Sequence, residues 1–414
     1  MEQAYRVLAG IDWGDEAHQV WAADAEGRAL GERHVPHRGV GLFAMADWLI
    51  GLADGDAGAV AVAIEVPHGP IVDTLLDRGC HVFAINPKQL DRFRDRFSPS
   101  GAKDDRRDAE VMSSAVRTDR RALRELHLAD PLTLQLREAS RQDAELQEDF
   151  QRLTNRLRDS LLRVWPELLG LAPAANEPWL WTLLEFAPTP SAGETLPLAR
   201  VRRILRKHHI RRLSAEEVAT VLRTPSVYLA PGVREGVTPR IADLLEQIWV
   251  VYAQRQQAER RLKASVQAIA DDTPTENVRE HQDVEILQSL PGIGTRITAM
   301  MLAEATQALR DRDYHALRVL GGSAPVTKQS GKSRVVHIRY ACHGRVRFAL
   351  RCWAMGAIQQ DAHARAHYDR LRNAGHNHER ALRGVVDRLI PMLMAMLRDG
   401  ALYDENRRRR SAAA

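Results

Sequence analysis

Short apolar runs alternate with one amphipathic stretch over the first 125 residues. Buried strands are predicted at YRVLAGID, AGAVAVAIEV and CHVFAINP, the last of which ends at Pro87. The segment HQVWAADAEGRALGERHV predicts two alternating strands joined at the Glu26-Gly27 turn, and residues 40–52 have a helical pattern. Three early strands, a helix, a strand, a helix and a strand together predict a mixed α/β sheet flanked by helices.

Helical periodicity replaces this pattern from residue 131 onward. Two long apolar stripes predict helices that pair as an antiparallel or an intermolecular coiled coil, the second interrupted at Arg255. Their members are Leu146, Phe150, Leu153, Leu157 and Leu161 in the first stripe, and Leu244, Ile248, Val251, Ala258, Leu262 and Ile269 in the second. Residues 173–239, which contain several Pro and Gly, are predicted to be an insertion or a small helical subdomain.

This organisation predicts an α/β + α protein. The expected parts are an α/β domain at residues 1–128, a coiled-coil connector with its insertion at 129–275, a mainly helical domain at 276–400 and a basic flexible tail at 401–414. The length of 414 residues, with 44% hydrophobic and 27% charged residues, is typical of a globular protein of two or three domains.

The composition also bears on location and redox chemistry. No apolar run approaches the roughly 20 residues that span a bilayer, and MEQAYRVLAGIDW lacks the layout of a signal peptide, so a cytoplasmic protein without a membrane partner is expected. Cys80, Cys342 and Cys352 form no CxxC pair, which argues against a disulfide framework and a thiolate zinc site. Each is expected to be a small buried hydrophobic residue.

Positive charge is concentrated in particular segments, although 59 Lys and Arg against 54 Asp and Glu give a net charge of only +5. Residues 314–360 contain no acid and eight bases, and residues 199–212 (ARVRRILRKHHIRR) and Arg407 to Arg410 are two further basic runs. Clustered bases without acids are typical of surfaces that contact a phosphate backbone. The alternatives are a solubilising patch and, for the last cluster, a flexible tail.

Four carboxylates are candidates for a metal site. In KDDRRDAE, residues 103–110, Asp105 and Asp108 are three apart and would share one helical face; a solvated face laced with salt bridges is the alternative. Asp12 lies within the apolar run VLAGIDW and Glu65 ends AVAIEV, where an unpaired acid is costly, although a structural role stays open for Asp12 alone. Meeting at one sheet edge, the four could hold two Mg²⁺ ions for phosphoryl transfer.

Ser330 is the candidate nucleophile. It lies in GGSAPVTKQSGKSR beside Lys328 and Lys332, whose charges would stabilise a phosphate on its hydroxyl. A turn serine without a chemical role is the alternative, because Ser-Gly is a common turn pair.

The segment LPGIG, residues 290–294, has the form of a helix-hairpin-helix turn. In such a turn the amides of Gly292 and Gly294 would approach a DNA phosphate. A plain corner between two helices is the alternative, because the motif is short.

These motifs, taken in order, resemble one protein family. GIDWGDEAHQVWAADAEG, AIEVPHG, INPKQL and KDDRRDAEVM resemble the N-terminal RuvC-like (RNase H-like) domain of the DEDD transposases of the insertion-sequence one-hundred-ten family. LPGIGTRITAMMLAE and GGSAPVTKQSGKSRVVHIRYACHGRVRFALRCWAM resemble the C-terminal transposase domain of that family. Residues 130–280 match only as a coiled-coil connector with an insertion.

The resemblance implies specific roles and partners. Asp12, Glu65, Asp105 and Asp108 would bind Mg²⁺, with Mn²⁺ as the alternative ion, and Ser330, in the P-x4-SG pattern that starts at Pro325, would be the nucleophile. The implied protein is a site-specific recombinase of a prokaryotic nucleoid that works as a homo-oligomer, a dimer or a tetramer, with RuvC-like and serine domains of different protomers in one active site. A structured noncoding bridge RNA would pair with donor and target DNA.

Two segments depart from the family pattern. Trp13-Gly14-Asp15 replaces a small residue and lysine, and HGRVR at 343–347 replaces a Lys-Arg-Gly-Asn-type stretch. These changes affect secondary contacts rather than the chemistry. Asp104 offers another register for the acidic helix, but only Asp105 and Asp108 keep the D-x-x-D spacing.

The functional hypothesis is DNA transposition through a covalent phosphoserine. Such an intermediate keeps the phosphodiester energy, so rejoining needs no ATP, and the chain has no Walker-type GxxxxGK[ST] motif. The rivals are a RuvC-like metal-dependent nuclease or junction resolvase, and a non-catalytic nucleic-acid-binding protein. Nucleic-acid contacts are predicted at Lys328, Lys332, Arg334, Arg339, Arg345, Arg347, Gly292 and Gly294.

Overall fold

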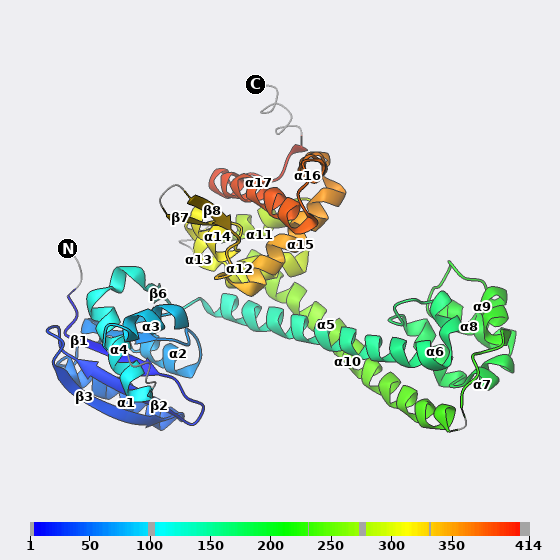
Figure 1. Cartoon of the computed structure of the whole chain (residues 1–414), viewed down its shortest axis with the longest axis horizontal. Helices are drawn as coiled ribbons and strands as arrows, with labels where there is room; N and C mark the ends of the chain where they lie inside the picture. The colour runs from blue at the N-terminus through cyan, green and yellow to red at the C-terminus, as the bar shows by residue number, and fades with distance from the viewer. Residues whose placement is uncertain (1–3, 98–103, 231, 273–278, 331–332, 406–414) are drawn as a thin grey trace. The chain divides into compact units, whose positions relative to one another are not determined.

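The computed structural model describes residues 4–97, 104–230, 232–272, 279–330 and 333–405. The chain divides into two compact units, Met1–Asp130 and Pro131–Ala414 (Figure 1). None of the described helices is long and apolar enough to cross a membrane.

The first unit is built on a six-stranded sheet in the order β3-β2-β1-β4-β5-β6. β4 is parallel to β1 and β5, whereas β2 is antiparallel to β1 and β3, and β6 is antiparallel to β5. The expected mixed α/β sheet is therefore confirmed. The elements are β1 (Val7–Asp12), β2 (Ala17–Ala23), β3 (Ala29–Pro36), α1 (Gly39–Leu52), β4 (Val60–Ile64), α2 (Pro70–Asp77), β5 (His81–Ala84), α3 (Pro87–Arg94), α4 (Asp105–Thr118) and β6 (Arg124–Leu126).

Helices cover both faces of this sheet because side chains alternate along each strand. Val7, Ala9 and Ile11 of β1 share a core with residues of α1 and α2. Leu8 packs instead with Val111 of α4 and other residues of the opposite face. β1 is therefore almost entirely buried, and the apolar run that predicted it reflects a central strand.

Local signals set the start of the two helices that matter for the site. α3 begins with Pro87 behind a capping box, in which the Asn86 side chain accepts from the Gln89 amide at 2.9 Å. α4 begins after Asp104, whose carboxylate accepts from the Arg106 amide at 2.9 Å. The acid-rich stretch therefore begins a helix, and Asp104 is its N-cap.

The second unit contains two long helices, α5 (Pro131–Val164) and α10 (Val233–Asp271). They pack against each other antiparallel, because Leu136 shares a core with Leu262 and the Phe150 ring lies 6.2 Å from that of Tyr252. The coiled coil predicted for this pair stays a prediction. Between them, the insertion folds as short helices around buried tryptophans: α6 (Pro178–Phe186), α7 (Pro190–Glu194), α8 (Leu198–Lys207) and α9 (Ala215–Arg223).

The rest of the second unit is mainly helical with one β-hairpin. Its elements are α11 (Arg279–Ser289), α12 (Thr295–Glu304), α13 (Thr306–Arg310), α14 (Tyr314–Leu320), β7 (Val326–Ser330), β8 (Ser333–His337), α15 (Gly344–Gln360), α16 (Ala362–Asn373) and α17 (His378–Asp399). They surround a core that includes Trp353. Tyr403 lies in the segment predicted as a flexible tail, yet its hydroxyl donates to Asp361 at 3.0 Å, so this tail is packed at its start.

Candidate functional site

Two of the predicted carboxylates lie side by side at one edge of the sheet. Asp12 is the last residue of β1, and Glu65 directly follows β4. The two strands are parallel neighbours with Ile11 opposite Ile64, so the register brings the next residue of each strand to the same edge. Adjacent strands are about 4.8 Å apart, which is close enough for the two side chains to share a ligand. Both residues are half-buried.

α4 carries the other two carboxylates to this edge by lying directly on β1. Gly10 allows the approach: a Cβ there would lie 1.9 Å from the Ala109 carbonyl oxygen. The Ser113 hydroxyl donates to the Leu8 carbonyl at 2.7 Å. Because Gly10 faces Ala109 and Leu8 faces Ser113, moving along β1 toward Asp12 means moving along α4 toward its first turn. That turn contains Asp105 and Asp108.

The carboxylate of Asp108 is engaged by an arginine. Its side chain is 1% exposed, and Arg94 of α3 donates to both oxygens, from Nε at 2.5 Å and from Nη2 at 3.0 Å. The hydrogen bond to Asp108 raises the pKa of Arg94 above its ordinary value. Asp105, by contrast, is exposed.

A divalent cation therefore fits this edge by donor chemistry, but the side chains are not yet arranged around one. Carboxylate oxygens are the ligands that Mg²⁺ prefers. Among the described residues, however, no three His, Cys, Asp or Glu side chains form a group that could hold a metal. Both oxygens of the Asp108 carboxylate accept hydrogen bonds from Arg94 instead.

A histidine pair that was not predicted from the sequence lies at the same edge. His18 is fully buried at the start of β2, and its Nε2 lies 2.8 Å from Nδ1 of His37. The Gly14 amide donates to Nδ1 of His18 at 3.3 Å, so in the neutral ring the proton is on Nε2 and is donated to His37. Burial, then His37 and His34, lower the pKa of His18. The signal was available, since His18 alternates with the inward-facing Val20.

Trp13 packs over this histidine pair. Its ring lies 6.2 Å from that of His18 and 6.4 Å from that of His37, and 37% of the residue stays exposed. The pair thus supports the residue that directly follows Asp12.

Ser330 ends the first strand of an exposed hairpin. β7 and β8 are antiparallel, with Ser330 opposite Ser333. Lys328 is two residues away and therefore on the same face of the strand as Ser330, and both are exposed. Arg334 of β8 is also exposed. Lys332 lies outside the described residues, as do Lys103 and Arg407 to Arg410.

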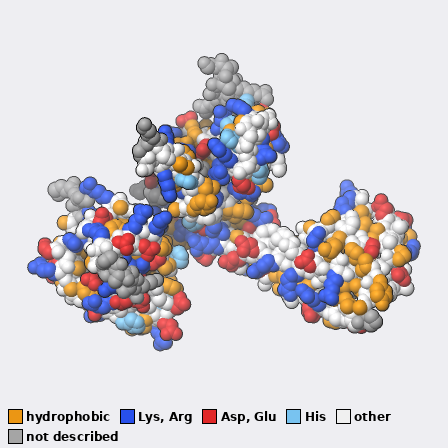
Figure 2. All heavy atoms as spheres, viewed as in Figure 1, with side chains coloured by type: hydrophobic (Ala, Val, Ile, Leu, Met, Phe, Trp, Pro, Cys, Tyr) orange, Lys and Arg blue, Asp and Glu red, His pale blue; other side chains and the backbone are white. Residues whose placement is uncertain are grey.

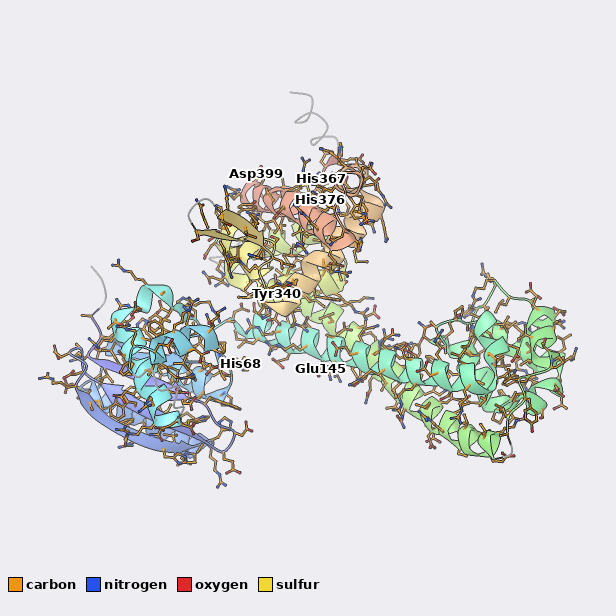
Figure 3. All side chains as sticks on the ribbon, in the orientation of Figure 1. His68, Glu145, Tyr340, His367, His376 and Asp399 are labelled. Carbon is orange, nitrogen blue, oxygen red and sulfur yellow. The ribbon has the colours of Figure 1, made fainter. Side chains whose placement is uncertain are left out.

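Two of the predicted nucleic-acid contacts support the base of this hairpin. Arg339 donates to the Ala324 carbonyl at 3.2 Å, which ties together the segments before β7 and after β8. Arg347 of α15 donates to the Arg339 carbonyl. Tyr340, labelled in Figure 3, follows in the chain and is 79% exposed.

Arg345 joins α15 to the long helix α5 through a buried acid. Its guanidinium lies 2.9 Å from Glu304, whose side chain is 4% exposed, and it donates to Ser140 at 2.7 Å. Arg141 also lies 3.4 Å from Glu304, and His343 lies 3.7 Å from it. One carboxylate of α12 therefore faces two guanidinium groups and an imidazole.

The contacts of Gly292 are those of a helix–helix corner. Its φ is +84°, and a Cβ there would lie 2.4 Å from the backbone nitrogen of Ala357. Its amide donates to the Gln360 side chain at 2.9 Å. Gly294 is the N-cap of α12, and nothing lies within 4 Å of the position a Cβ would take there.

The second basic run lies on and after α8. Val201, Ile204 and Leu205 are buried, whereas Arg202 pairs with Glu216 at 2.7 Å and Arg212 with Glu177 at 2.7 Å. Figure 2 shows Lys and Arg side chains on the visible face of the inserted helices. Part of this charge is therefore neutralised inside the insertion.

Comparisons with known proteins match two separate stretches of the chain. Residues 9–166 match the model of the DEDD transposases of the IS110 family, described as "Transposase", and residues 284–369 match the model "Transposase IS116/IS110/IS902 family". The "Mini-circle putative transposase for IS117" of Streptomyces coelicolor is 31% identical over 98% of this chain and 97% of its own length. The "Insertion element IS110 uncharacterized 43.6 kDa protein" of the same organism is 28% identical over 96% and 95%.

A further relative is more similar over a shorter stretch. The "Putative transposase y4uE" of Sinorhizobium fredii is 47% identical over 231 residues, which are 55% of this chain and 62% of that protein. The first family model ends at residue 166 and the second begins at 284, so the inserted helices lie outside both. With matches at both ends and a relative aligned over nearly its full length, the chain belongs to the IS110 family of DEDD transposases.

Proposed function

We propose that this transposase cuts and rejoins DNA by metal-dependent phosphoryl transfer at the sheet edge that bears Asp12, Glu65, Asp105 and Asp108. The observation that carries the proposal is the approach of α4 to β1 at Gly10, which directs two acids of a helix toward two acids of adjacent strands. A pair of Mg²⁺ ions, or of Mn²⁺, would polarise the scissile phosphate there and stabilise the charge that develops on its oxygens.

The strand transfer itself is assigned to Ser330. Its Oγ attacks the phosphorus and forms a phosphoserine, the bond from phosphorus to the 3′ oxygen breaks, and the hydroxyl proton ends on that leaving oxygen. A new 3′-hydroxyl then attacks the phosphoserine and restores the serine. Lys328, on the same face of β7, would stabilise the negative charge on the phosphate.

The proposed partners are donor DNA, target DNA and a structured bridge RNA. The acid-free segment 314–360 supports a phosphate-binding surface, and within it Lys328 and Arg334 are exposed on the hairpin. Homo-oligomerisation would bring a DEDD edge and a serine hairpin of different protomers to one phosphate. A junction resolvase or nuclease would need the carboxylates alone.

The test uses two pairs of matched variants on a nicked suicide substrate. Ser330→Ala should abolish the covalent protein–DNA adduct and recombination, whereas Ser333→Ala, which removes the hydroxyl opposite it, should retain both. Asp105→Asn should abolish cleavage, whereas Asp104→Asn should not, because asparagine still caps α4. Cleavage without any adduct in the unaltered protein would identify a hydrolytic nuclease. Full activity of Asp105→Asn, or activity in EDTA, would refute the metal site.

A further inference from the structure

Asp108 is the one predicted metal ligand that is both buried and fully paired. Arg94 donates a hydrogen bond to each of its two oxygens. Because the side chain is only 1% exposed, a hydrated ion cannot reach the carboxylate. If Asp108 binds metal, as the proposed function requires, the guanidinium has to leave first. A cation and a guanidinium that use the same two oxygens exclude each other by occupancy and by charge.

Arg94 also forms an ion pair with a second acid. Its Nη1 donates to Asp91 at 2.5 Å, and this carboxylate is 65% exposed. Asp91 lies three residues earlier on the same helix, α3, so the guanidinium keeps a partner when it rotates away from Asp108. The side chain of Arg94 is itself 20% exposed, so water already reaches it beside Asp108.

Loss of Arg94 without a replacement would leave a buried anion. An uncompensated buried charge is strongly destabilising, and here it would repel Asp105 in the first turn of α4. Arg94 thus neutralises the Asp108 carboxylate and fixes its position while no metal is bound.

We propose that Arg94 is a positioning residue that holds Asp108 in the metal-free protein and is displaced onto Asp91 when a divalent cation binds. This inference rests on the proposed metal site, where the Arg94 guanidinium competes with the cation for the oxygens of Asp108. The affinity measured for the ion is then the intrinsic affinity reduced by the release of Arg94.

The test measures Mn²⁺ binding to the full chain by electron paramagnetic resonance, without any DNA. Arg94→Gln should tighten Mn²⁺ binding on the order of tenfold, because a charged hydrogen bond no longer competes. Asp91→Asn should weaken it, because the displaced guanidinium loses its second partner. Arg96→Gln is the matched control: it removes a neighbouring charge that pairs with Asp119 instead, so Mn²⁺ binding should stay as in the unaltered protein.

A thermal readout keeps the inference testable if Arg94→Gln folds poorly. Without metal, Arg94→Lys should melt at a lower temperature than the unaltered protein, because lysine lacks the planar guanidinium that donates to both carboxylate oxygens. Addition of Mn²⁺ should raise the melting temperature of Arg94→Lys by more than it raises that of the unaltered protein. Unchanged or weaker Mn²⁺ binding in both Arg94 variants would overturn the inference and leave Arg94 a structural partner of Asp108. If the unaltered protein shows no Mn²⁺ site that Asp105→Asn removes, the metal proposal fails as well.

Discussion

Gly10→Ala should dislodge α4 and disorganise the carboxylate edge. The new Cβ would lie 1.9 Å from the Ala109 carbonyl oxygen, 2.6 Å from the Ser113 backbone nitrogen and 2.8 Å from the Met112 Cβ. Two of these atoms belong to the helix backbone, so no change of rotamer relieves the overlap. To restore an ordinary contact of 3.4 Å, α4 would have to withdraw by about 1.5 Å.

The cost follows from overpacking and from one lost hydrogen bond. Inserting a methyl group into a packed core costs about 1–3 kcal/mol, and the upper end applies where backbone has to move. Withdrawal of α4 also breaks the hydrogen bond from Ser113 to Leu8, worth about 1 kcal/mol. The free energy of unfolding of the first unit should fall by about 3–4 kcal/mol, which corresponds to a melting temperature lower by roughly 10 °C.

Calorimetry and hydrogen exchange on the full chain would measure this effect. Peptides from α4 should lose protection in Gly10→Ala, and Mn²⁺ binding should weaken with them. Gly51→Ala is the control, because no atom lies within 4 Å of its Cβ position in α1, and alanine there should stabilise by about 0.5–1 kcal/mol. A Gly10→Ala protein that melts like the unaltered one, with α4 still protected, would refute the close approach.

Three further predictions concern other parts of the chain. Glu304→Gln should lower the free energy of unfolding of the second unit by about 3 kcal/mol in urea titrations, because it leaves several cations around one buried position. Glu379→Gln, which removes the acid of an exposed pair, should lower it by less than about 1 kcal/mol. The pKa of His18 is lower in the folded protein than in the unfolded chain, so its contribution to stability should be fully present above about pH 6.5 and should be lost as the pH falls further. His18→Asn should make the melting temperature depend less on pH. Neutralising Lys328 and Arg334 together should reduce the slope of log affinity against log salt by about two in anisotropy titrations with duplex DNA; an unchanged slope would show that this face of the hairpin binds no phosphate.

The sequence by itself determined the elements whose signal is local. Alternation of side chains predicts β2 and β3 with their turn, because successive side chains of a strand point to opposite faces. Apolar stripes predict the long helices α5 and α10 from a period near 3.6. The D-x-x-D spacing places Asp105 and Asp108 on one turn of α4, and the ordered motifs at the two ends predict the transposase family, which the comparisons confirm.

Only the tertiary structure decided what each candidate residue touches. Arg94 and Asp108 lie on separate helices, and their pairing depends on how α3 lies against α4, which no sequence pattern predicts. The sequence likewise marks Arg345 as a basic residue of an acid-free window, whereas packing of α15 on α12 brings it to Glu304. Sequence periodicity reports which face of an element is buried, not which distant residue faces it. That choice is made by close packing, such as the contact at Gly10, across segments a hundred residues apart.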